Sequence, residues 1–77
     1  MDTKMTDVTL HIDEATRHDE REELRSSLLK MDGVMAAASL DEKPHLMVIE
    51  YDPDTVNSRE FLDVVEKQGL HAELIGL

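Results

Sequence analysis

The sequence predicts an α+β fold in which two helices cover one face of a four-stranded antiparallel sheet. Apolar residues alternate with polar ones in several short segments, which is typical of half-buried strands. In two longer segments the apolar residues recur at spacings of three and four, which is typical of amphipathic helices. A chain of 77 residues has room for one domain. We expect a disordered tail over residues 1–6 and a single domain over residues 7–77.

The first strand and the first helix are expected between the tail and the first glycine. Three apolar residues of the strand alternate with polar ones: Val8, Leu10 and Ile12. The helix has one apolar face, with residues at spacings of four and three: Leu24, Leu28 and Met31. We expect Thr16 to be the N-cap of this helix, with Asp19 as its capping-box partner. Gly33 is placed to end the helix in a left-handed conformation.

A hairpin, a second helix and a short last strand are expected in the rest of the chain. The hairpin consists of a strand over residues 34–40, a turn over residues 41–44 and a strand over residues 46–51. A connection this short makes the two strands antiparallel. Asn57 or Ser58 caps the second helix, with Glu60 placed to reach back to Asn57. Gly69 ends this helix, and residues 71–75 form the last strand.

The order of the expected elements is therefore β-α-β-β-α-β. Each helix has one apolar stripe, so both helices must cover the same side of one sheet. Because crossover connections are right-handed, the ferredoxin-like sandwich is the arrangement that fits this order. We expect the first and third strands to be the central pair and to run parallel to each other.

Four short runs of the sequence occur in an order and at a spacing that resemble one known family. They are LKMDGV at residues 29–34, YDPD at residues 51–54, SREFL at residues 58–62 and VEKQGL at residues 65–70. Together they resemble the heavy-metal-associated domains of copper chaperones and metal-pumping ATPases. The resemblance implies the same ferredoxin-like fold. It also implies a soft-metal site, which in the family is formed by the motif Cys-x-x-Cys at the start of the first helix.

This chain departs from that motif because it contains no cysteine. Counting back from Gly33 places the two family cysteines at Arg17 and Glu20. Thiolate sulfur suits Cu(I), whereas Glu20 offers hard oxygen and the protonated guanidinium of Arg17 cannot be a ligand. We therefore expect no Cu(I) transfer and no cofactor. Arg17 and Glu20 either form an ion pair across the former metal loop or are separately solvated.

Histidine and carboxylate side chains near the same loop leave a second metal hypothesis open. The candidate ligands for Zn²⁺, Ni²⁺ or Cu(II) are His18, Asp19, Glu20, Glu22 and His71. His18 and Glu22 are one helical turn apart, and the family resemblance implies that His71 lies near the loop. No two histidines have a recognised ligand spacing. We expect the other histidines, His11 on the open sheet face and His45 in the hairpin turn, to be exposed.

The charge balance limits the classes of partner. Eighteen Asp and Glu residues against eight Lys and Arg residues give a net charge of −10, which disfavours nucleic acid and anionic membranes. No apolar run reaches the roughly 20 residues of a membrane span, and no signal peptide is recognisable, so we expect a cytoplasmic protein. The first loop, residues 13–16, has no glycine to cradle phosphate as in acylphosphatases, and no catalytic constellation stands out. We expect a non-catalytic protein whose partner has a basic surface.

One face of the sheet is expected to lack a helical cover. If Met47 and Ile49 face the helices, then Leu46 and Val48 lie on the uncovered face, beside His11 of the neighbouring strand. A modest apolar patch of this kind marks a partner surface or a face for self-association. Two exposed aliphatic residues are also ordinary in a soluble protein. The leading hypothesis is a binding module with a heavy-metal-associated scaffold, and divalent-metal binding is the alternative.

Overall fold

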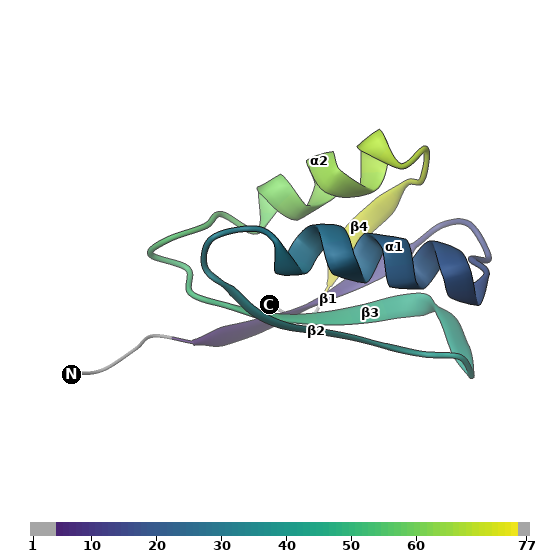
Figure 1. Ribbon diagram of the computed structural model, residues 1–77, viewed down its shortest axis with the longest axis horizontal. Helices are drawn as coiled ribbons and strands as arrows, with labels where there is room; N and C mark the ends of the chain where they lie inside the picture. The colour runs from purple at the N-terminus through teal and green to yellow at the C-terminus, as the bar shows by residue number, and fades with distance from the viewer. Residues whose placement is uncertain (1–4, 76–77) are drawn as a thin grey trace.

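The computed structural model describes residues 5–75 and confirms the β-α-β-β-α-β order (Figure 1). The elements are β1 (Thr6–Ile12), α1 (His18–Leu29), β2 (Val34–Leu40), β3 (Lys43–Tyr51), α2 (Arg59–Lys67) and β4 (Ala72–Ile75). Both helices lie on one face of a four-stranded sheet, which is the predicted ferredoxin-like sandwich. Residues 1–4 of the predicted tail lie outside the described residues. Thr6, also assigned to that tail, already belongs to β1 and pairs with Tyr51.

The strand order across the sheet is β2-β3-β1-β4, so β1 and β3 are the central pair as predicted. The prediction that they run parallel is wrong, because β1 and β3 pair antiparallel, as do β2 with β3 and β1 with β4. The connection through α1 makes β2 parallel to β1 but does not place it next to β1, and there is room for one strand between them. β3 turns back from β2 through a tight hairpin and fills that gap, so it must oppose both neighbours.

The core lies between the sheet and the two helices, and it follows the predicted alternation. Its fully buried side chains are Val8, Leu10, Ile12, Leu24, Leu28, Met47, Ile49, Phe61 and Val65. Tyr51 and Phe61 meet edge to face, with ring centroids 5.0 Å apart, which joins β3 to α2. On the other side of the sheet, Thr9 pairs with Val48 and His11 with Leu46. This uncovered side is the predicted open face.

Two local predictions are confirmed at the helix ends and a third is confirmed in part: Gly33 is left-handed as expected, but α1 ends at Leu29, with Lys30 as its C-cap, rather than at Gly33. Gly33 has φ +92°, and a Cβ there would lie 2.9 Å from Thr55 Cβ, so this position requires glycine. Gly69 also has a left-handed φ, of +82°. At the start of α2, the backbone N–H of Asn57 donates to Glu60 Oε2 at 2.9 Å, as expected for a capping box.

Two other local predictions are wrong. The N-cap of α1 is Arg17 rather than Thr16, since α1 begins at His18 and Glu20 Oε1 accepts the hydrogen bond from Arg17 N at 2.8 Å. The hairpin turn is shorter than expected, because β3 begins at Lys43. His45 therefore lies in a strand, where its Nδ1–H donates to Ile12 O at 2.7 Å and it is only partly exposed.

Candidate functional site

The loop between β1 and α1, residues 13–17, holds the positions where the family resemblance implies a metal site. Arg17 Nε lies 3.5 Å from Asp19 Oδ1 and 3.7 Å from Glu20 Oε1. Of the two alternatives left open by the sequence, the structure therefore shows the ion pair. Glu20 also accepts the N–H of Arg17, so its carboxylate acts as the helix cap. Arg17 and Glu20, the two positions where the resemblance implies cysteines, therefore contact each other.

Arg21 lies directly beneath this loop and is the feature that sequence reasoning missed. Its residue exposure is 4%, and it continues the apolar face of α1 three residues before Leu24. Arg21 Nη1 donates to Thr16 O at 2.6 Å and to Thr16 Oγ1 at 3.1 Å. Arg21 Nη2 donates to Asp41 Oδ1 at 2.6 Å. Arg21 Nε is buried without a partner among the described residues. A cationic side chain is thus buried at the base of the loop between β1 and α1.

Thr16 explains why the cap prediction was wrong. Its hydroxyl donates to Pro44 O at 2.6 Å and accepts from Arg21, so its oxygen is not directed at the amides of α1. Thr16 is itself buried, and it ties the loop to the start of β3. The polar contacts of Thr16, Arg21 and Asp41 therefore fasten the loop, the helix start and the hairpin turn together at one end of the molecule (Figure 1).

Each of the two candidate histidine ligands is paired with a carboxylate. His18 Nδ1 lies 3.0 Å from Asp41 Oδ1, and this hydrogen bond raises the pKa of His18. The same bond, with a second one from Arg21, lowers the pKa of Asp41. His71 Nδ1 lies 2.7 Å from Glu14 Oε2, which raises the pKa of His71 and lowers that of Glu14. These shifts favour protonated imidazolium, whereas a metal ligand must be neutral.

The structure does not bring the five predicted metal ligands together. His18 contacts the hairpin turn, His71 contacts Glu14, and Glu22 lies 3.9 Å from Arg25. Asp19 and Glu20 face Arg17. Within residues 5–75 there is no group of three or more His, Asp or Glu side chains arranged to hold a metal ion.

His71 does lie beside the loop, as the resemblance implied, since its carbonyl accepts the N–H of Asp13 at 2.7 Å. The donor set does not fit the soft metal that the fold family implies. The chain has no sulfur ligand apart from methionine thioethers, and a buried guanidinium lies at the base of the loop.

The remaining two histidines form a stacked pair. The rings of His11 and His45 have centroids 5.7 Å apart and an interplanar angle of 11°. His45 is bonded to Ile12 O, so the prediction of an exposed turn histidine is wrong, and the cause is the longer β3. His11 of this pair lies opposite Leu46 in the register of β1 and β3.

The open face has an apolar hollow of about 120 Å³ near the outer edge of the sheet. It is lined by Ala38, Leu40, Lys43, Leu46 and Val48. Val48 is 43% exposed and Leu40 is 56% exposed. The predicted interface residues Leu46 and Val48 therefore lie where the sequence placed them, and Ala38 and Leu40 of β2 extend the patch.

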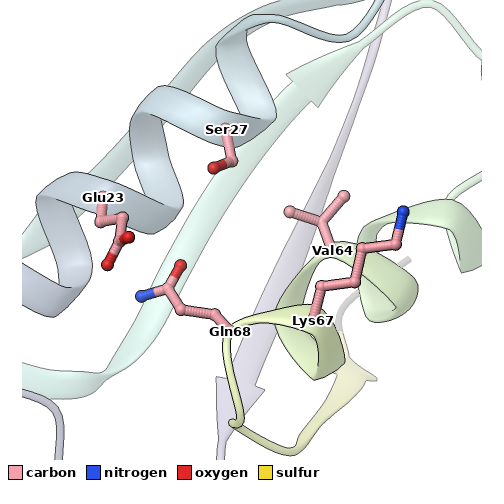
Figure 2. A pocket seen from close by; sticks show the side chains of 5 residues that line it. All are labelled: Glu23, Ser27, Val64, Lys67 and Gln68. Atoms are coloured by element: carbon pink, nitrogen blue, oxygen red, sulfur yellow. The ribbon is translucent and has the colours of Figure 1, made fainter.

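A second groove of about 270 Å³ runs between the helices on the opposite side of the molecule (Figure 2). It is lined by Glu23 and Ser27 of α1, by Val64 and Lys67 of α2 and by Gln68, the C-cap of α2. Gln68 Nε2 bridges the groove by donating to Glu20 O at 2.8 Å. Its lining is mixed in charge and polarity, in contrast to the aliphatic hollow on the open face.

Comparison with known proteins supports the fold rather than an activity. No family model and no curated protein sequence matches the chain. Oxidized MerP from Ralstonia metallidurans superposes with a TM-score of 0.84 at 15% identity, over 95% of this chain and 100% of that one. The N-terminal domain of a potential copper-translocating P-type ATPase from Bacillus subtilis, in its Cu(I)-loaded state, gives 0.82 at 20% identity, over 95% and 90%.

The CopZ metallochaperone gives a TM-score of 0.80 at 22% identity, over 88% of this chain and 100% of that one. The chain thus has the fold of the heavy-metal-associated domains and lacks their Cys-x-x-Cys motif. Neither helix in the described part of the chain has the length and apolar run needed to cross a membrane.

Proposed function

We propose that the chain is a cytoplasmic, non-catalytic binding module that uses the open face of its sheet to recognise a protein partner with a basic surface. The observation that carries this proposal is the uncovered aliphatic hollow around Leu46 and Val48. Burying exposed aliphatic surface contributes roughly 25 cal/mol per Å², so such a patch favours association. His11 lies opposite Leu46 in the sheet and offers a polar contact beside the same surface.

The charge of the chain supports a basic partner. A net charge of −10 on a domain of this size accelerates encounter with a positive surface and slows encounter with a negative one. For the same reason, self-association through the open face is the less favoured form of the proposal, because two copies repel each other.

Divalent-metal binding at His18, Asp19, Glu20, Glu22 and His71 is the second candidate. It is supported by the position of His71 beside the loop, through the hydrogen bond from Asp13 N. Metal binding requires His18 and His71 to leave their carboxylate partners and to lose a proton. Because the pKa values of both histidines are raised, metal binding is weakened at any pH below those values.

Two matched variants test the leading proposal. Proteins captured from a cytoplasmic extract are compared for the natural chain, Val48→Lys on the open face and Ser26→Lys on the exposed side of α1, and the retained partner is then purified and titrated. Each substitution adds one positive charge. We expect Ser26→Lys to keep the partner and Val48→Lys to weaken the purified complex about tenfold or more. Equal binding by both variants would contradict the proposal.

A metal titration that is followed by the NMR chemical shifts of the backbone amides tests the second candidate, divalent-metal binding. Saturable shifts with Zn²⁺, Ni²⁺ or Cu(II), confined to residues 17–22 and 70–71, would support a metal site. Diffuse shifts that disappear with added salt indicate only general attraction to an acidic surface.

A further inference from the structure

We infer that the partner adds a strand to the free edge of β2. The segment it supplies has about seven residues, apolar side chains at alternate positions and a basic residue at each end. This inference rests on the proposed function, because it specifies the chemistry of the partner that covers the open face. It is argued from the composition of β2, its hydrogen bonds, the adjacent hollow and the charges at its two ends.

β2 is an outer strand of the sheet, and its protection as an edge is limited to two register shifts against β3 and the side chain of Arg25. Its sequence, VMAAASL, contains neither a charged residue nor a proline. Met35 is 61% exposed and Leu40 is 56% exposed. Natural proteins generally guard edge strands with lysine, proline or a covering element, since an open edge pairs with other chains. The opposite edge, β4, is only four residues long and carries Glu73.

The backbone of β2 is available to a further strand. Among the described residues, Arg25 is the one whose side chain hydrogen-bonds to this backbone, with Nε donating to Ala37 O at 2.8 Å. Ala37 therefore directs its backbone groups away from β3, and by alternation Ser39 does the same. Ala37 is only 5% exposed and its carbonyl already accepts from Arg25, so a further strand bonds there only if this arginine side chain moves. No side chain of the described residues bonds the backbone of Ser39.

The apolar hollow lies beside this edge on the open face. Ala38 and Leu40 of β2 and Leu46 and Val48 of β3 line it, together with Lys43 at the start of β3. A strand added to β2 places every second side chain on the same face as Ala38, next to the hollow. The edge and the hollow together can therefore bind a segment with alternating apolar side chains. Backbone hydrogen bonds to the edge give affinity, and contacts with the hollow give specificity.

The two ends of β2 are acidic. Asp32 precedes the strand and Glu42 follows it, both are exposed, and neither forms an ion pair with another residue in the range 5–75. In an antiparallel pair of two β2 strands, Asp32 of each copy would meet Glu42 of the other, so like charges would face each other at both ends. A segment with a lysine or arginine at each end meets opposite charges instead. The ends of β2 therefore favour a basic partner over a second copy.

A synthetic peptide provides the test. The probe has seven residues of alternating valine and threonine between two lysine pairs, and the control has glutamate pairs instead. We expect the lysine peptide to produce saturable amide shifts over residues 34–40 and 46–48, and the glutamate peptide to bind at least about tenfold more weakly. The double variant Asp32→Lys/Glu42→Lys is expected to reverse this preference.

Two substitutions at one position test the backbone contact. Ser39→Pro removes an outward N–H without removing a ladder bond, and Ser39→Ala keeps it. We expect Ser39→Pro to weaken peptide binding at least about tenfold and Ser39→Ala to bind like the natural chain. Equal binding by both variants, shifts on another surface or no saturable shift up to about 1 mM peptide would overturn the inference. A mass that doubles with concentration, with residues 34–40 shifted, would assign the edge to a second copy instead.

The outcomes separate this inference from the proposed function. If Val48→Lys abolishes binding of the captured partner but Ser39→Pro leaves it intact, the open face is the interface and strand addition is wrong. If both variants leave binding of that partner intact, the proposed function fails as well.

Discussion

The loop before α1 and the outer edge of the sheet differ in whether their side chains have partners within the protein. In the loop region, Arg21, His18 and His71 each contact a carboxylate, and the buried Thr16 bonds both Arg21 and Pro44. At the edge, β2 is uncharged and an aliphatic hollow is uncovered. Groups that are already paired stabilise a structure, whereas an unpaired surface is available for binding. The contrast supports the proposal that the loop of this scaffold has a structural role and that the sheet carries recognition.

The largest effect is expected from Arg21→Ala. Alanine removes the guanidinium that bonds Thr16 and Asp41 and leaves a cavity beside Leu24, so we expect a loss of about 3 kcal/mol in the free energy of unfolding. Arg17→Ala is the control in the same loop; it is exposed and should change stability by less than about 0.5 kcal/mol. Urea denaturation measures both, and equal losses would show that the buried network has no special role.

A smaller effect is expected from Thr16→Val, which keeps the shape but removes the hydroxyl. Pro44 O loses its donor and Arg21 loses one of its acceptors, while Thr16 O still accepts from Arg21. We expect a loss of about 1–2 kcal/mol in the free energy of unfolding. A variant as stable as the natural chain would mean that water replaces the hydroxyl at no cost.

Stability should also depend on pH through the two surface pairs. The pKa values of His18 and His71 are raised from 6.5. Their contribution to the free energy of unfolding is therefore fully present below pH 6.5 and is lost as the pH rises through the raised values. The pKa values of Glu14 and Asp41 are lowered from 4.5 and 3.8, so their contribution is complete above pH 4.5 and is lost as the pH falls through the lowered values.

The pairs His18–Asp41 and His71–Glu14 therefore stabilise the fold fully between pH 4.5 and pH 6.5. Thermal unfolding across pH 4 to 9 measures this, and added salt should reduce the dependence because the pairs are exposed. Substituting His18 and His71 with glutamine should flatten the alkaline side of the profile. An unchanged profile would show that these pairs do not form in solution.

The smallest effect on stability is expected on the other side of the comparison. Val48→Lys replaces a side chain that is 43% exposed on the open face, so we expect the free energy of unfolding to change by less than about 0.5 kcal/mol. The same substitution should disrupt partner binding, which separates the two regions. A large destabilisation in urea would instead show that Val48 belongs to the structural core.

The fold could be predicted from the sequence because its elements follow simple periodicities. The alternation of Val8, Leu10 and Ile12 and the glycines after both helices were sufficient for the element order. The prediction of parallel pairing between β1 and β3 was wrong because it did not take into account that β3 lies between β1 and β2 and turns back from β2. The open face was also predictable, since Leu46 and Val48 alternate with buried neighbours in β3.

The polar network beneath the loop could not be predicted in the same way. Arginine is rarely buried, so the apolar face of α1 was expected to begin at Leu24 rather than at Arg21. The partners of Arg21 are close in space but distant in sequence, since Asp41 lies in the hairpin turn. The spacing of three and four between Arg21, Leu24 and Leu28 was the one sequence pattern that could have indicated that Arg21 lies on the buried face of α1. Thr16 was assigned as a cap because its contact with Pro44, 28 positions away, leaves no local pattern.

A competition for Cu(I) tests most directly the claim that the loop has become structural. The natural chain and the double variant Arg17→Cys/Glu20→Cys are each titrated against a coloured cuprous chelator under reducing conditions. We expect the double variant to withdraw the metal, because it restores two thiolates, and the natural chain to leave the chelator saturated. Withdrawal of Cu(I) by the natural chain as strongly as by the cysteine variant would contradict the account.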